Sequence, residues 1–198
     1  MRHREQETSE SWRLFIAIEL PAEIRHKIQK YIDRLRSELP EVRASWVRER
    51  NLHLTLKFFG DIALERVEGV SRALQAAAAD MPQLKIDIRD RGSFPARGTP
   101  SVLWVGIEDS SGNLDKLHEA LENECERAGF ARDPRSFHPH LTIARLRDSR
   151  GARRLADLHK STDLPDVGVR VQHVCLIRSE ISSAGSRYTV VARYELKS

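Results

Sequence analysis

One four-residue pattern, His-apolar-Thr-apolar, occurs twice in the chain. Its copies are His53-Leu54-Thr55-Leu56 and His140-Leu141-Thr142-Ile143, and their histidines are 87 positions apart (140 − 53). Side chains alternate between the two faces of a β-strand. Each copy is therefore predicted to be a strand that buries an aliphatic pair on one face and presents an imidazole beside a hydroxyl on the other.

The elements around the two copies repeat in the same order. Hydrophobic spacing predicts, in each half, a strand, a helix, the His-x-Thr strand, a second helix and a further strand. This order indicates an internal duplication, with two similar lobes related by a pseudo-twofold axis and a groove between them. The expected strands cover residues 12–20, 52–59, 84–89, 102–107, 139–146, 167–177 and 188–196, and the expected helices cover 22–39, 63–79, 111–128 and 150–159.

Two imidazoles beside two hydroxyls favour acid–base chemistry on a phosphate ester. The unperturbed imidazole pKa is about 6.5, so at neutral pH one histidine can act as general base and the other as general acid. His53 and His140 are the candidate catalytic pair, and Thr55 and Thr142 are candidate donors to the non-bridging phosphoryl oxygens. A lone strand histidine is commonly structural, and threonine is common in strands. The duplication is what favours catalysis.

Two basic residues that follow the patterns are candidate substrate-binding residues. Strict alternation places Lys57 on the face of His53, where it could reach a phosphate, although a solvated lysine at a strand end fits the position equally. Alternation places Arg145 on the face opposite His140, so it reaches the groove only if the strand bulges near Ala144. Spacing alone therefore makes Arg145 a structural residue.

Composition fits an anionic substrate without deciding the function. The 198 residues include 33 Lys and Arg against 29 Asp and Glu, a net charge of +4. The two cysteines match no metal-site or disulfide spacing, and no phosphate-cradling glycine loop occurs. His138-Pro139-His140 could chelate a metal, but suitably spaced acidic ligands are absent nearby. We therefore expect no metal and no other cofactor, ATP included.

The ends and the apolar content of the chain indicate its location. Residues 1–11 are polar and charged, lack the apolar segment of a signal peptide, and are expected to be flexible. No apolar run is long enough to span a bilayer. Residues 12–198 are expected to form a single bilobed domain of a cytoplasmic protein that has no membrane partner.

The sequence resembles the two-histidine phosphoesterase superfamily, specifically the RNA 2′,3′-cyclic phosphodiesterases that are also known as 2′-5′ RNA ligases. The resemblance covers nearly the whole chain and rests on four segments: Arg13–Ile18, Asn51–Gly60, Pro100 with Val102–Gly106, and Phe137–Arg145. It implies an α+β fold of two lobes, each an antiparallel sheet with helices outside, around a central cleft. It also implies catalysis without a metal.

The implied activity is the opening of a terminal 2′,3′-cyclic phosphate of RNA to a 2′-phosphate. By the resemblance, His53 protonates the 3′ oxygen, His140 is the base on water, and Arg145 contacts the phosphate; the sequence alone does not fix which imidazole has which role. RNA ends with a cyclic phosphate are the expected partner of a monomer. Ligation by the reverse reaction, hydrolysis of a small cyclic nucleotide, and RNA binding without turnover stay open as alternatives.

Overall fold

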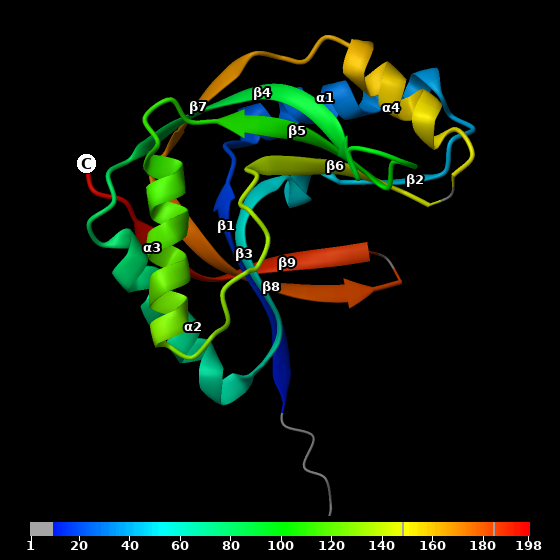
Figure 1. Ribbon diagram of the computed structural model, residues 1–198. Helices are drawn as coiled ribbons and strands as arrows, with labels where there is room; N and C mark the ends of the chain where they lie inside the picture. Colours follow the sequence, from blue (N-terminus) through cyan, green and yellow to red (C-terminus); the bar gives the residue numbers. More distant parts are fainter. Residues whose placement is uncertain (1–9, 148, 184) are drawn as a thin grey trace, which may run out of the picture.

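The computed structural model describes residues 10–147, 149–183 and 185–198 (Figure 1). Strands and helices alternate along most of this chain, and a short 3₁₀ turn, η1 (Glu49–Asn51), precedes the first His-x-Thr strand. The helices are α1 (Ala22–Glu38), α2 (Leu64–Ala78), α3 (Asn113–Arg127) and α4 (Ala152–Ser161). The strands are β1 (Ser11–Glu19), β2 (Ala44–Trp46), β3 (His53–Ala63), β4 (Leu84–Phe94), β5 (Val102–Glu108), β6 (His140–Leu146), β7 (Val167–Val171), β8 (His173–Ser182) and β9 (Gly185–Glu195).

The strands form two sheets in which hydrogen-bonded neighbours are antiparallel. The four-stranded sheet has the order β3-β1-β8-β9, and the five-stranded sheet has the order β2-β6-β5-β4-β7. Figure 1 shows the five-stranded sheet above the four-stranded one. The expected α+β fold with an antiparallel sheet in each lobe is confirmed.

The helices pack through the apolar faces that their spacing predicts. α1 buries Ile24, Ile28, Ile32 and Leu35, which are three or four residues apart. In Figure 1, α1 runs behind β4 and β5 toward α4 at the upper right, and α2 and α3 lie side by side at the left. Buried residues of both sheets and all four helices belong to one continuous core.

The two sheets exchange strands between the halves of the sequence. β4 follows α2 in the first half, yet it pairs with β5 of the second half. In return, β8 from the second half pairs with β1. The single strand expected over residues 167–177 is therefore wrong: it is split at Gln172 into β7 and β8, which lie in different sheets. Neither lobe is built from one half of the chain alone.

The pairing register records the duplication residue by residue. On the four-stranded sheet, the partners between β1 and β3 run from Phe15↔Phe58 to Glu19↔His53. On the five-stranded sheet, those between β5 and β6 run from Val102↔Arg145 to Gly106↔His140. Each of these positions is 87 residues after its counterpart, so the same backbone arrangement surrounds both histidines.

The N-terminal prediction falls mostly outside the described residues, which begin at residue 10. The predicted flexible segment also includes Ser11, but this residue already pairs with Ala63 as the first residue of β1. No helix in the described part of the chain is long and apolar enough to cross a membrane.

Candidate active site

Both histidines are held by their own backbone in the same way. The Nδ1 atom of His53 lies 2.7 Å from the carbonyl oxygen of Asn51, and that of His140 lies 2.6 Å from the carbonyl oxygen of His138. A carbonyl oxygen can only accept, so Nδ1 carries the hydrogen in each ring. The neutral imidazoles therefore both present the lone pair of Nε2 for proton transfer.

The threonines of the two patterns differ in their contacts. Nε2 of His53 lies 3.1 Å from Oγ1 of Thr55, whose hydroxyl can donate to it when the ring is neutral. Thr55 is exposed and Thr142 is half-buried. Nε2 of His140 makes no hydrogen bond to Thr142 among the described residues, so it is open to a proton from another donor.

A β-bulge interrupts both strands directly after the threonine. The register of β3 skips Leu56, and that of β6 skips Ile143. An extra residue in one strand reverses the alternation beyond it. Strict alternation therefore predicts the wrong face for both Lys57 and Arg145. Lys57 lies on the face opposite His53, and Arg145 lies on the same face as His140.

Lys57 does not lie on the histidine face, contrary to the sequence prediction. Its side chain is buried and only 4% of the residue is exposed. The ammonium group lies 2.7 Å from a carboxylate oxygen of Glu122, and it donates to the carbonyl oxygen of Ala131 at 2.9 Å. Lys57 thus links β3 to α3 and the loop after it, and has no route to a substrate phosphate.

Arg145 also lies on the face opposite to the one that strict alternation predicts, and this is the face of His140. The bulge after Thr142 places it as an exposed residue in register with Val102. Its positive charge lowers the pKa of the His140 imidazole, because it disfavours the protonated ring. The condition stated from the sequence, a bulge near Ala144, is met. The site residue that spacing rejected is therefore close to the second histidine.

Burial lowers the pKa of both imidazoles, but their charged neighbours differ. Desolvation is the main cause for His53, and the Asn51 carbonyl and the carboxylate of Glu19 act against it. Desolvation is also the main cause for His140; the His138 carbonyl opposes it, while electrostatic interactions with His138 and Arg145 add to it. Of these two histidines, only His53 has a carboxylate among the described residues that favours its protonated form.

Glu19, which faces His53 across the β1–β3 pair, belongs to a small polar cluster. Burial opposes its ionisation, but hydrogen bonds from Arg193 at 2.7 Å and Cys175 at 3.3 Å outweigh burial and hold the pKa of Glu19 below its usual value. Glu19 was not among the candidate site residues predicted from the sequence. The alternation of side chains along β1 places Glu19 on the same face as Phe15 and Ala17, and this pattern could have identified it from the sequence.

Aromatic rings fix the orientation of both histidines. The ring of His53 lies 4.8 Å from that of Phe15 and 5.3 Å, edge-on, from that of Tyr188. The ring of His140 lies 5.2 Å, edge-on, from that of Phe94. These contacts limit the rotation of the imidazoles. Tyr188 comes from β9 and has no sequence signal that connects it to the pattern.

The chain also matches a known protein family. Residues 24–181 match the family model described as the 2′-5′ RNA ligase superfamily, which spans most of the chain. The chain belongs to the 2′-5′ RNA ligase superfamily. Both His-x-Thr patterns lie within the matched residues.

Two relatives in this superfamily align over nearly their whole length. An RNA 2′,3′-cyclic phosphodiesterase of Methanothermobacter thermautotrophicus is 33% identical over 93% of this chain and 98% of its own. One of Escherichia coli is 30% identical over 95% and 98%. The crystal structure of E. coli LigT complexed with 3′-AMP has a TM-score of 0.73 at 29% identity and covers 96% of this chain and all of that one.

A small cavity of about 60 Å³ opens beside His53 in this superfamily member. Its lining combines the imidazole with two arginines and the Tyr188 ring, which gives it a basic wall. The other lining residues are apolar or belong to the Glu19 cluster; the full lining is Glu19, Arg25, Arg50, Leu52, His53, Ile177, Tyr188 and Val190.

One group of side chains in the described residues has the composition of a metal site. The donor atoms of Glu19, His173 and Cys175 lie within 4.8 Å of one another. However, the Glu19 carboxylate already forms an ion pair with Arg193 at 2.7 Å. In the metal-free protein, burial raises the pKa of the Cys175 thiol to about 11. The geometry therefore favours a hydrogen-bonded cluster over a metal centre.

Proposed function

We propose that this protein hydrolyses the terminal 2′,3′-cyclic phosphodiester of RNA to a 2′-phosphomonoester by general acid–base catalysis without a metal. The observation that carries the proposal is the pair of tethered imidazoles, each with Nδ1 bound to a carbonyl and each on a strand of the same register. The names of the relatives, RNA 2′,3′-cyclic phosphodiesterase, agree with it.

The reaction assigns one proton transfer to each histidine. Nε2 of His140 accepts a proton from water while the water oxygen forms a bond to phosphorus. The bond between phosphorus and the 3′ oxygen breaks, and protonated Nε2 of His53 gives its proton to that oxygen. The products are a 2′-phosphate and a 3′-hydroxyl. Thr55, Thr142 and Arg145 stabilise the negative charge on the non-bridging oxygens.

The charges near the two rings support this division of roles. A general acid must hold a proton, and the Glu19 carboxylate favours protonation of His53. A general base must be neutral, and Arg145 and His138 disfavour protonation of His140. Burial lowers the pKa of both imidazoles, but Glu19 opposes this effect at His53 and Arg145 adds to it at His140. Such a difference in charged neighbours is how related groups are specialised as acid and base.

Ligation is the second candidate, and the description of the matched family favours it. The same acid–base pair would join a 2′,3′-cyclic end to a 5′-hydroxyl in a 2′-5′ linkage, because His140 could take the proton from that hydroxyl in place of water while His53 still protonates the departing 3′ oxygen. Water is in large excess over RNA ends, so hydrolysis is the function we expect to dominate. A small cyclic nucleotide would need the same chemistry.

The location, the oligomeric state and the partners of the protein are also proposals. We infer a cytoplasmic location, since Cys125 and Cys175 are both buried free thiols of the kind that a reducing compartment preserves. A monomer is sufficient, because both histidines come from one chain. RNA ends that carry a cyclic phosphate are the expected partners.

The test is one gel assay in excess EDTA. A short RNA with a 2′,3′-cyclic phosphate is incubated with the wild type, His53→Ala and His140→Ala, and the product is treated with a phosphatase that removes only 3′-phosphates. We expect a phosphatase-resistant monoester from the wild type alone. An EDTA-sensitive reaction would contradict metal independence, and a folded wild type without activity would redirect the search to small cyclic nucleotides.

A further inference from the structure

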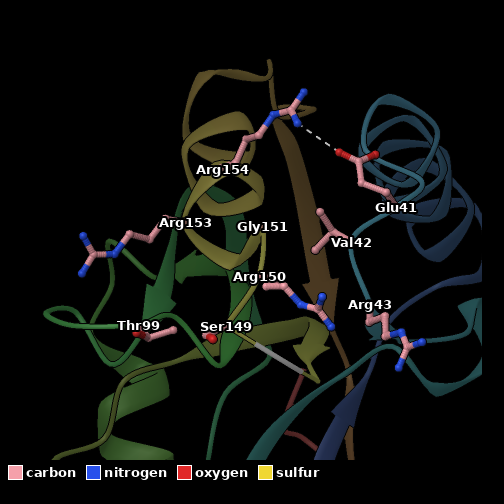
Figure 2. A pocket seen from close by; sticks show the side chains of 9 residues that line it. All are labelled: Glu41, Val42, Arg43, Thr99, Ser149, Arg150, Gly151, Arg153 and Arg154. Atoms are coloured by element: carbon pink, nitrogen blue, oxygen red, sulfur yellow. Dashed lines mark hydrogen bonds and ion pairs between the residues drawn. The ribbon is translucent and has the colours of Figure 1, made fainter.

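A large basic hollow lies at the rim of the five-stranded sheet, beyond the end of β6. Its volume is about 760 Å³, and four exposed arginines dominate its lining (Figure 2). The segments before β2, between β4 and β5, and at the start of α4 contribute to it. The lining residues are Glu41, Val42, Arg43, Thr99, Ser149, Arg150, Gly151, Arg153 and Arg154.

The contact between Val42 and Gly151 brings these arginines together. Gly151 has a φ of 73°, and a Cβ atom there would lie 2.6 Å from a methyl group of Val42. Only glycine permits both this backbone conformation and this close approach. The start of α4 is thereby pressed against the segment before β2, so Arg150 and Arg153 share one hollow with Arg43.

The hollow has more positive charge than its own residues neutralise. Arg154 forms an ion pair with Glu41 at 3.0 Å, which uses the carboxylate in the lining. Arg43 and Arg153 form no ion pair within residues 10–147, 149–183 and 185–198. In Figure 2, Arg43 and Arg150 point away from the Arg154–Glu41 pair. A polyanion could therefore bind here without displacing that pair.

The hollow is connected to the candidate active site through β6. Arg145 pairs with Ser45 of β2, and two residues further on the amide of Arg147 donates to the carbonyl oxygen of Arg43 at 3.0 Å. A strand rises about 3.3 Å per residue, so the seven residues from His140 to Arg147 span roughly 20 Å. Arg145 and Arg147 lie between the second histidine and the hollow.

We propose that this hollow binds the sugar–phosphate backbone of RNA upstream of the cyclic end. The inference rests on the proposed function: a cyclic phosphate occupies the 3′ terminus, so the rest of the RNA can leave the site only on its 5′ side. Guanidinium groups bind phosphates through paired hydrogen bonds. The lining contains no aromatic ring on which a base could stack, so binding is independent of base sequence.

The experiment compares Arg43→Gln/Arg153→Gln with wild type on two substrates that end in a 2′,3′-cyclic phosphate. One is a dinucleotide, and the other is an RNA of about ten nucleotides, which is long enough to cross the roughly 20 Å span. We expect the variant to raise KM for the longer RNA about tenfold and to leave the dinucleotide unchanged. The slope of log affinity against log salt should become shallower by about 1.4, which corresponds to two lost phosphate contacts.

The control variant is Arg72→Gln, which removes an exposed arginine from α2. It should behave as wild type with both substrates. If wild type opens the dinucleotide and the longer RNA equally well, or if Arg43→Gln/Arg153→Gln loses activity on both equally, the hollow does not bind the RNA backbone, while the proposed function stands. If wild type opens neither, the proposed function fails; fluorescence anisotropy with a 2′-phosphate RNA then still tests the hollow without turnover.

Discussion

The two His-x-Thr strands share a backbone and differ in the charges around it. In both, Nδ1 is bound to the carbonyl two residues earlier and a bulge follows the threonine. The 87-residue offset makes Gly106 the counterpart of Glu19, and Phe58 the counterpart of Arg145. Among these counterparts, the carboxylate of Glu19 acts on His53 and the guanidinium of Arg145 acts on His140.

This difference shows how a duplicated scaffold can supply two different catalysts. Identical strands would give two imidazoles of equal basicity, and neither would be preferred as acid or base. Two single-residue differences, Glu19 on β1 and Arg145 on β6, act on the protonation preferences of the two rings in opposite senses. The scaffold sets the positions of the reacting atoms, and the substitutions set their roles.

Removal of either imidazole should have the largest effect. We expect His53→Ala and His140→Ala each to lower kcat/KM by about 10²–10⁴, the usual contribution of general acid–base catalysis. The double variant should lose less than the product of the two, because the residues act together. Single-turnover assays with a cyclic-phosphate RNA measure all three.

A sulfur-substituted substrate distinguishes the role of His53 from that of His140. With sulfur in place of the 3′ bridging oxygen, the leaving group is a thiolate whose conjugate acid has a pKa of about 8.5, so it needs no proton to leave. His53→Ala should then recover most of its activity, and His140→Ala should not. Recovery in His140→Ala instead would reverse the acid and base assignments.

The position directly after the bulge also differs, since Lys57 in β3 corresponds to Ala144 in β6. Lys57 and Glu122 are a buried ion pair at 2.7 Å. Lys57→Ala leaves a buried carboxylate without its partner and should lower the free energy of unfolding by about 3–5 kcal/mol. Urea denaturation measures this, and Lys57→Met/Glu122→Leu should restore most of the loss. A loss in Lys57→Ala below about 1 kcal/mol, as for a surface pair, would contradict the buried placement.

Arg145 tests the next position along the strand. Arg145→Gln removes a charged hydrogen-bond donor to the phosphate, worth about 1.5–3 kcal/mol, and should lower kcat/KM by at least about tenfold. It should also raise the pKa of His140 and move the acidic limb of the pH profile to higher pH. Phe58→Leu changes the corresponding position of β3 and is the matched control. Equal effects of both variants would contradict a phosphate contact by Arg145.

The sequence predicted the features that depend on period and duplication. Apolar spacing found the buried face of α1, and the repeated pattern found His53 and His140 on equivalent strands. Strict alternation failed at Lys57 and Arg145, because a bulge depends on hydrogen bonding to the neighbouring strand and leaves no simple local signal. For the same reason the exchange of β4 and β8 between sheets was not visible in the order of elements.

The smallest expected effect comes from Glu19, and it concerns pH. The rate should rise with pH as His140 loses its proton and fall as His53 loses its own; burial places both pKa values below the ordinary imidazole value. Glu19→Gln removes the negative charge that favours protonated His53. The alkaline limb of the kcat/KM profile should therefore shift to lower pH, while the acidic limb stays in place.

Cys175→Ser is the matched control for this profile, because it changes a hydrogen bond to Glu19 and keeps the carboxylate charge. It should leave both limbs close to those of the wild type. If Glu19→Gln moved the acidic limb instead, His53 would be the base, and the carboxylate would serve to strengthen its affinity for the proton taken from water. The two profiles thus decide whether the charge difference between the duplicated strands sets the direction of proton transfer.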